Sequence, residues 1–328
     1  VCSSDLKNLL KLSKLTFLLF VGFSIQSCSD DDDVTTPTGP SNIVEIALDT
    51  PDLSNLVAAL SVADGNLVDV LSGGEFTVLA PTNEAFETFL AANGFMSLSE
   101  VPTDVLSNIL LNHVISGTIN STNLVDAGSG YSTTNASNMD GDNLSLYFDT
   151  SSGVTFNGIS SVVAADIVAS NGIVHVVDEV IGLPTVVTFA VSNPALSTLV
   201  AALTTEGLSV DIVSILSSSD EPSPFTVFAP TNDAFGSLLA ELELNALGDI
   251  PVDILAATLG THVAPEANVR STDLVDGMSV NTISSTITVS LSDGAKLIDS
   301  GGRESNIVAV DIQAYNGVVH VIDNVLLP

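Results

Sequence analysis

The chain has 328 residues, of which 39 are acidic and only 6 are Lys or Arg, so its formal net charge at pH 7 is −33. Proteins that bind DNA or RNA neutralise phosphates with a basic patch, so this balance excludes direct nucleic-acid binding. The length is sufficient for two domains with cores of their own, and two cysteines are too few for a disulfide framework.

Residues 1–27 are expected to be a secretory signal peptide. Lys7, Lys11 and Lys14 precede a short apolar stretch, which is the order of a basic region and an apolar core. About eleven apolar positions are too few for a membrane-spanning helix, which needs roughly 20. Cys28 follows a small residue, as in a bacterial lipobox, and is the candidate lipidation site. An ordinary signal peptide with an incidental cysteine is the alternative.

Residues 28–42 are expected to form a tether after the lipid anchor. Four consecutive aspartates at 30–33 are followed by a stretch rich in Thr, Pro, Gly and Ser, a composition that favours a solvated spacer. We therefore expect a protein that is secreted across the inner membrane. Its lipid would hold it in the cell envelope, at the outer membrane or cell surface.

The next stretch of the chain, 43–75, contains helical spacing of apolar residues. Pro51 is suited to the first position of a helix. Leu53, Leu56 and Leu60 then recur on one helical face.

Residues 76–86 read F-T-V-L-A-P-T-N-E-A-F and predict a buried strand followed by a capped helix. Pro81 cannot donate to a sheet ladder, so the strand should end there. Thr82 or Asn83 can then accept a hydrogen bond from a free N–H group of the first helical turn.

A further helix is expected between Pro102 and His113. From about residue 128 apolar and polar residues alternate, as at Leu144, Leu146 and Phe148. This period of two predicts antiparallel strands with one buried face. Helices followed by a β-rich half indicate an α+β fold class.

The same series of blocks occurs twice. F-T-V-F-A-P-T-N-D-A-F at 225–235 matches 76–86, and N-G-V-V-H-V-I-D-N-V at 316–325 matches N-G-I-V-H-V-V-D-E-V at 171–180. A repeat of this length is a whole domain rather than a solenoid unit. We expect two modules, 43–184 (module one) and 185–328 (module two).

These repeated blocks, with a central His before Val, resemble the fasciclin (FAS1) family. The resemblance covers nearly all of the chain after residue 42. It implies adhesion modules, each a two-sheet β-wedge with packed helices, and it implies no catalytic activity and no cofactor. The positions that match the family's structural blocks are Thr82, Asn83, His113, His175, Thr231, Asn232, His262 and His320.

The resemblance also points to candidate partner-binding residues. Integrin-recognition motifs of the family include an Asp-Ile pair shortly before the closing block. Asp166 and Ile167 hold this place in module one, and Asp311 and Ile312 hold it in module two. The alternative is that both aspartates are turn carboxylates that bond local backbone.

Catalytic and metal sites are not favoured by the sequence. The four histidines lack cysteines or clustered carboxylates at ligand spacing, so packed, hydrogen-bonded histidines are the preferred interpretation. No nucleophile elbow G-x-S-x-G supports a hydrolase triad. Asp140 and Asp142 flank a glycine, which makes them a weak calcium candidate, although Asp-Gly is also common turn chemistry.

The sequence thus predicts a cell-surface adhesion protein without enzymatic activity. Its partners would be extracellular proteins, matrix, polysaccharide or neighbouring cells, with a lipid anchor in the membrane. The alternative is a periplasmic or surface protein that binds a small molecule or a cation on the same scaffold. An enclosed apolar pocket with convergent polar groups would favour that alternative. The oligomeric state stays open.

Overall fold

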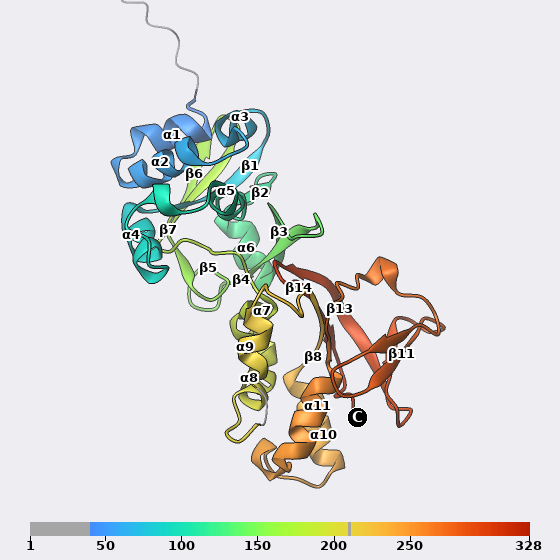
Figure 1. Ribbon diagram of the computed structural model, residues 1–328. Helices are drawn as coiled ribbons and strands as arrows, with labels where there is room; N and C mark the ends of the chain where they lie inside the picture. The colour runs from blue at the N-terminus through green and yellow to red at the C-terminus, as the bar shows by residue number, and fades with distance from the viewer. Residues whose placement is uncertain (1–39, 209–210) are drawn as a thin grey trace, which may run out of the picture. The chain divides into compact units, whose positions relative to one another are not determined.

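The computed structural model of the protein describes residues 40–208 and 211–328, which belong to one compact unit (Figure 1). The expected signal peptide, the lipidation candidate Cys28 and the tether up to residue 39 lie outside the described residues.

Module one combines a helical layer with a seven-stranded sheet. Its helices are α1 (Ile43–Asp49), α2 (Ser54–Val62), α3 (Leu67–Ser72), α4 (Asn83–Ala92), α5 (Thr103–Leu111) and α6 (Ser121–Ala127), with 3-10 turns η1 (Pro51–Leu53) and η2 (Leu98–Glu100). Its strands are β1 (Phe76–Pro81), β2 (Val114–Ser116), β3 (Ser129–Ser137), β4 (Asn143–Asp149), β5 (Thr155–Phe156), β6 (Ser160–Ala169) and β7 (Gly172–Val177). The strands follow this order around a closed barrel, because β7 pairs in parallel with β1.

Module two repeats the arrangement. Its helices are α7 (Val186–Ser192), α8 (Ser197–Leu203), α9 (Ile212–Ser217), α10 (Asn232–Glu241) and α11 (Val252–Thr261), with η3 (Pro194–Leu196), η4 (Leu247–Asp249) and η5 (Ser271–Asp273). Its strands are β8 (Phe225–Pro230), β9 (Val263–Ala264), β10 (Ser279–Asn281), β11 (Thr286–Ser290), β12 (Lys296–Ile298), β13 (Glu304–Ala314) and β14 (Gly317–Ile322). The sheet order is β10-β11-β12-β13-β14-β8-β9, and β14 pairs in parallel with β8.

The predicted fold class, an α+β chain of two tandem modules, is confirmed. So is the predicted strand, stop and capped helix, because β1 ends at Pro81 and the Thr82 hydroxyl accepts the Ala85 N–H at 3.2 Å. The helix expected after Pro102 is α5, which ends two residues before His113.

Each module has its own apolar core. In module one, Phe86 and Leu106 lie among the helices, and Leu79, Leu146 and Phe156 fill the barrel. In module two, residues such as Phe189, Phe225 and Phe235 pack against the helices, and Ile287 and Leu297 lie inside the sheet. Burial of these side chains is the main force that holds each module together.

Within the described ranges, no single helix is long and apolar enough to cross a membrane. One bent pair, 186–192 and 194–203, passes that test only by length and composition, with a bend of 99°.

The expectation of one buried face is wrong for β4. Leu144 and Leu146 are buried as predicted, but Ser145 on the opposite face is only 7% exposed and Tyr147 only 3%. The Tyr147 ring belongs to the core cluster of module two, together with Phe189. The second face of β4 is therefore covered by module two.

Candidate functional site

In each module, the threonine of the F-T-V block holds one loop through its hydroxyl group. In module one, the buried Thr77 hydroxyl donates to the Gly117 carbonyl at 2.8 Å and accepts the Ile119 N–H at 2.7 Å. These bonds fix the start and the middle of the loop 117–121, which leads from β2 to α6. We call it loop A.

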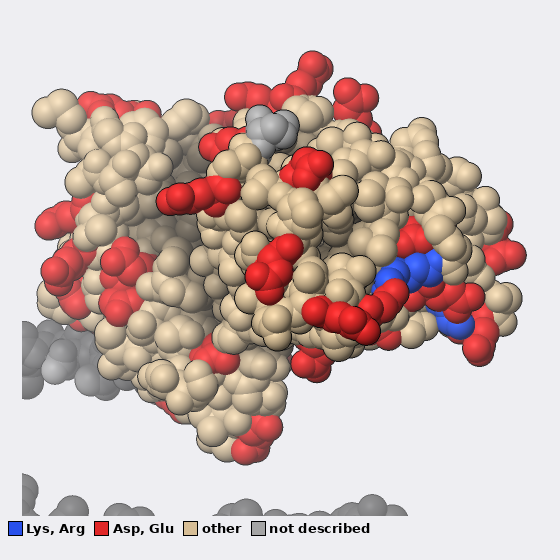
Figure 2. Space-filling view, turned by 90° about the horizontal axis from the view of Figure 1, so that it is seen from below, with Lys and Arg blue, Asp and Glu red and all other residues tan. Residues whose placement is uncertain are grey.

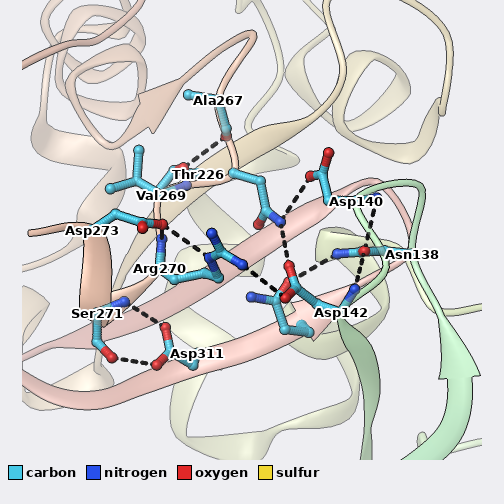
Figure 3. A network of polar contacts seen from close by, with 12 residues as sticks. Asn138, Asp140, Asp142, Thr226, Ala267, Val269, Arg270, Ser271, Asp273 and Asp311 are labelled. Carbon is cyan, nitrogen blue, oxygen red and sulfur yellow. Dashed lines mark hydrogen bonds and ion pairs between the residues drawn. The ribbon is translucent and has the colours of Figure 1, made fainter.

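Module two holds the equivalent loop, 267–271, in the same way, and we call it loop B. The Thr226 hydroxyl donates to the Ala267 carbonyl at 2.8 Å and accepts the Val269 N–H at 2.9 Å. Figure 3 shows this threonine beside the two loop residues.

The histidine of the closing block in each module forms a hydrogen bond with the same loop. His175 accepts the Asp166 N–H at its Nδ1 atom, at 3.2 Å, so its Nε2–H group donates to the Ile119 carbonyl at 2.9 Å. His320 repeats this contact with the Val269 carbonyl at 2.8 Å. Burial lowers the pKa of His320, since a charged imidazolium loses its hydration there.

The aspartates of the Asp-Ile pairs bind the same loops. We call the threonine, histidine and aspartate that hold one loop its clamp. Asp166 lies at a register shift between β6 and β7 and has a φ of 59°. Asp is one of the residues that tolerate this left-handed conformation. Its carboxylate accepts hydrogen bonds from the Ser121 hydroxyl and from the Ser121 N–H, the latter at 2.8 Å. These bonds lower the pKa of Asp166, because they stabilise its charged form.

Module two uses Asp311 in the same role. Its φ is 57°, and its carboxylate accepts the Ser271 N–H at 2.7 Å and the Ser271 hydroxyl. Figure 3 shows Asp311 directed at Ser271. In both modules the aspartate anchors a loop that is 40 or more residues away in the sequence, so it does not bond only local backbone.

The isoleucines of the same pairs lie mostly inside the fold. Ile312 is 3% exposed in the core of module two, which contradicts its assignment to a partner-binding surface. Ile167 is half-buried and packs against the core of module one. Packing of the strand explains both, since each side chain points away from solvent at the bulge.

The remaining family histidines lie in the interior. His113 donates from Nδ1 to the Ile109 carbonyl at 2.7 Å, and its Nε2 accepts the Ile181 N–H at 2.9 Å. His262 makes the same pair of bonds with Thr258 and Leu326. Burial lowers the pKa of both histidines to about 4, so both are neutral at pH 7.

The asparagines of the strand–helix block tie two helix starts together. Asn83 accepts the Asn55 N–H at 2.8 Å and donates to the Pro51 carbonyl at 3.0 Å. Asn232 makes equivalent bonds to Thr198 and Pro194 in module two. Thr231 caps α10 as Thr82 caps α4.

The turn that contains the calcium candidates is a contact between the modules. The Asn138 side-chain oxygen accepts the N–H groups of Asp140 and Asp142, at 3.0 and 2.9 Å. Loop B reaches this turn, because Asn268 donates to both carboxylates and Arg270 Nη1 lies 3.0 Å from Asp142 Oδ1 (Figure 3).

An ion pair therefore replaces the weak calcium assignment. Arg270 places its positive charge on Asp142, where a calcium ion was considered from the sequence, and it also pairs with Asp273 at 3.0 Å. This pairing lowers the pKa of Asp273. Among the described residues, no group of three or more His, Cys, Asp or Glu could hold a metal ion.

An aromatic cluster forms a second contact between the modules. We call this cluster and the contact of Asp140 and Asp142 with loop B together the joint. Tyr131 of β3 lies 5.1 Å from Tyr147 and 5.7 Å from Phe189 of α7, measured between ring centroids. Asn193 donates to the Tyr131 hydroxyl at 3.2 Å, and burial raises the pKa of Tyr131 to about 12. On β13, the Gln313 N–H donates to the Ser145 hydroxyl at 3.0 Å.

Among the charged side chains of the surface, acidic ones far outnumber basic ones. Figure 2 shows them spread over one face of the molecule, whereas the basic atoms visible there are confined to one region. Modules one and two each carry 17 acids, and module one has no Lys or Arg. This surface repels anionic partners.

Sequence reasoning named the histidines and aspartates that hold the loops, but it missed the threonines and serines that hold them and the residues of the joint. Thr77 and Thr226 recur in both strand blocks, and Ser121 and Ser271 open the matched blocks S-T-N-L-V-D and S-T-D-L-V-D. This repetition was a usable signal for the clamp. Tyr147 and Arg270 occur in one module only, so the repeat gave no signal for them.

Comparisons with known proteins agree with this architecture. The sequence profile of the Fasciclin domain matches residues 51–184 and 194–328. Protein sll1483 of Synechocystis is 38% identical over 144 residues, which are 44% of this chain and 73% of that protein. The cell surface glycolipoprotein MPB83 of Mycobacterium bovis is 45% identical over 94 residues, which are 25% of this chain and 41% of that protein.

A solved structure shows the same fold for the pair. It is a FAS1 domain pair from the insect cell adhesion molecule Fasciclin I, with a TM-score of 0.51 and 21% identity over 84% of this chain and 97% of that one. With the profile matching both modules, the chain belongs to the fasciclin family and consists of two tandem fasciclin modules.

Proposed function

We propose that this chain is a cell-surface attachment protein, whose fasciclin pair binds an extracellular partner without chemical turnover. The observation that carries the proposal is the use of the family motif. In each module one threonine, one histidine and one aspartate hold loop A or loop B, namely Thr77, His175 and Asp166, and Thr226, His320 and Asp311. They act as a scaffold for an exposed surface, since none is left as a free nucleophile or base.

The cavity inside the core of module one does not support the alternative of a small molecule held in an enclosed apolar pocket. The apolar cavity inside module one has a volume of about 30 Å³ and is lined by residues such as Leu56, Leu110 and Val174. This is far below the 300–1,000 Å³ or so that small-molecule sites usually need. The cation alternative loses its candidate because Asp142 is paired with Arg270.

The anchor remains part of the proposal. We expect Cys28 to carry the lipid, and the relative from Mycobacterium bovis is described as a cell surface glycolipoprotein. One acyl chain gives only marginal membrane binding, so stable retention requires at least two. The partner would be an extracellular protein or polysaccharide.

The proposal is tested in cells that make the protein. Cells lacking the chain should attach less well to their natural surface or to each other. Re-expression of the natural chain should restore attachment, whereas Cys28→Ser should release soluble protein and leave attachment low. Normal attachment by cells that lack the chain would contradict the proposal. Membrane retention of Cys28→Ser would contradict the anchor alone.

A further inference from the structure

A cleft of about 320 Å³ lies where module two meets module one. Module one supplies Asp104, Ser107 and Leu111 from α5 and Met139 from the turn after β3, while module two supplies Tyr315. The volume is at the lower end of the range of roughly 300–1,000 Å³ found for small-molecule sites. It is therefore large enough to hold a small ring or one unit of a polymer.

Most polar side chains around this cleft are already paired. Asn108 bonds the backbone of Ser137 through both of its side-chain polar atoms, and Ser107 donates to the Thr103 carbonyl. The Asp104 carboxylate and the Tyr315 hydroxyl form no hydrogen bond with any residue in 40–208 or 211–328. These two groups are therefore available to a ligand.

The apolar part of the lining complements these two groups. Met139 is 58% exposed, and the half-buried Tyr315 is held at the tip between β13 and β14 by its N–H bond to the Pro184 carbonyl at 2.7 Å. A pyranose ring has one apolar C–H face and a rim of hydroxyl groups. An aromatic ring can cover the face, and a carboxylate can accept from the hydroxyls with a charge-assisted bond.

The negative charge of module one restricts the kind of sugar that can bind in the cleft. Module one carries 17 acids and no basic residue, so a polysaccharide built from uronic acids or sulfated sugars would be repelled. We propose that the cleft binds a neutral hexopyranose unit of an extracellular polysaccharide. This inference rests on the proposed attachment function and names the partner class for it.

The second module provides an internal comparison. At the equivalent place, α11 presents Asp253 beside Ala256 and Ala257, and the turn after β10 presents Ile283. The position of Tyr315 corresponds to Ser170 in module one, because each precedes the Asn-Gly of the closing block. Of these two places among the described residues, the cleft between the modules is the one that combines an aromatic ring with a free carboxylate.

The test uses the compact unit, residues 39–328, and defined sugars. Calorimetry would measure binding of neutral hexaoses, namely cellohexaose, laminarihexaose and mannohexaose, with hexagalacturonic acid as the anionic comparison. Tyrosine fluorescence gives a second readout, since the chain has 3 Tyr and no Trp. We expect saturable binding of at least one neutral hexaose and none of the anionic one.

The variants separate the two groups that recognise the sugar. Asp104→Asn should weaken binding about tenfold, the usual effect of losing one charge-assisted hydrogen bond. Tyr315→Ser should weaken binding about tenfold by removing the aromatic wall, and Tyr315→Phe should weaken it less because the ring remains. Asp253→Asn is the matched control and should bind within about twofold of the natural protein.

The proposal is overturned if no neutral hexaose binds, or if Asp104→Asn and Asp253→Asn behave alike. Because Asp104 makes no hydrogen bond through its side chain among the described residues, Asp104→Asn should keep its thermal midpoint and remain informative if Tyr315→Ser loosens the joint. Cells that still attach although the protein binds no sugar would overturn the cleft assignment and leave the attachment function standing.

Discussion

Tyr147 offers the sharpest perturbation of the joint between the modules. It is a residue of module one, on β4, yet it is 3% exposed within the core cluster of module two. The Tyr131 ring packs against it at a tilt of 57°, with ring centroids 5.1 Å apart, and also contacts Phe189 at 5.7 Å. Tyr147→Ala removes one ring of this cluster without changing a residue of the loop clamps.

The expected loss of stability follows from the burial. Truncation of a buried aromatic side chain costs about 3–5 kcal/mol, and we expect about 3 because water can enter from the edge of the joint. For domains of 150–250 residues each kcal/mol shifts the thermal midpoint by roughly 2–4 °C, so the midpoint should fall by about 6–12 °C. Differential scanning calorimetry of residues 39–328 measures this shift.

Ser290→Ala supplies the matched control. Ser290 follows Val289 on β11 as Tyr147 follows Leu146 on β4, but it does not contribute to the joint. A surface change of this kind should alter stability by no more than about 0.5 kcal/mol. If Tyr147→Ala shifts the midpoint no more than Ser290→Ala, the aromatic cluster does not hold the modules together.

Two further predictions concern pH and salt. The pKa of His113 and His262 is about 4 in the folded state, against an ordinary value of 6.5, so the unfolded chain takes up protons first as the pH falls. Their contribution is complete above pH 6.5 and decreases towards pH 4, by about 3 kcal/mol for each histidine at most. Denaturant titrations from pH 7 to pH 4.5 test this, and a free energy of unfolding that stays flat would refute it. Added salt should raise the thermal midpoint, because like charges are screened over about 10 Å at 0.1 M but only about 3 Å at 1 M. A midpoint that falls between these two NaCl concentrations would contradict the repulsion argument.

The local parts of the fold could be predicted from the sequence. Pro81 stops a strand by lacking an N–H group, and Thr82 caps a helix across three residues, so both effects are visible in a short window. Repetition of the blocks then gave the number of modules and their order. These predictions succeed because the decisive contacts are close in sequence or occur twice.

The clamp and the joint depend on contacts that are distant in sequence. Asp166 bonds Ser121 across 45 residues, and Arg270 reaches Asp142 across 128. Alternation along β4 indicated a buried face at Leu146, but it could not show that Tyr147 on the other face would meet a second module. The calcium candidate at Asp142 met Arg270 for the same reason, since the sequence around a carboxylate does not reveal which distant donor will pair with it.

The most direct test of the account is attachment by the purified module pair. Beads that carry residues 39–328 would be applied to surface polymers from cells that make the protein, and retention and polymer length would be measured together. The account predicts saturable retention that is reversed by soluble module pair, with the polymer recovered at its original length. Beads that are not retained, or a polymer that shortens steadily with time, would contradict the proposal of binding without turnover.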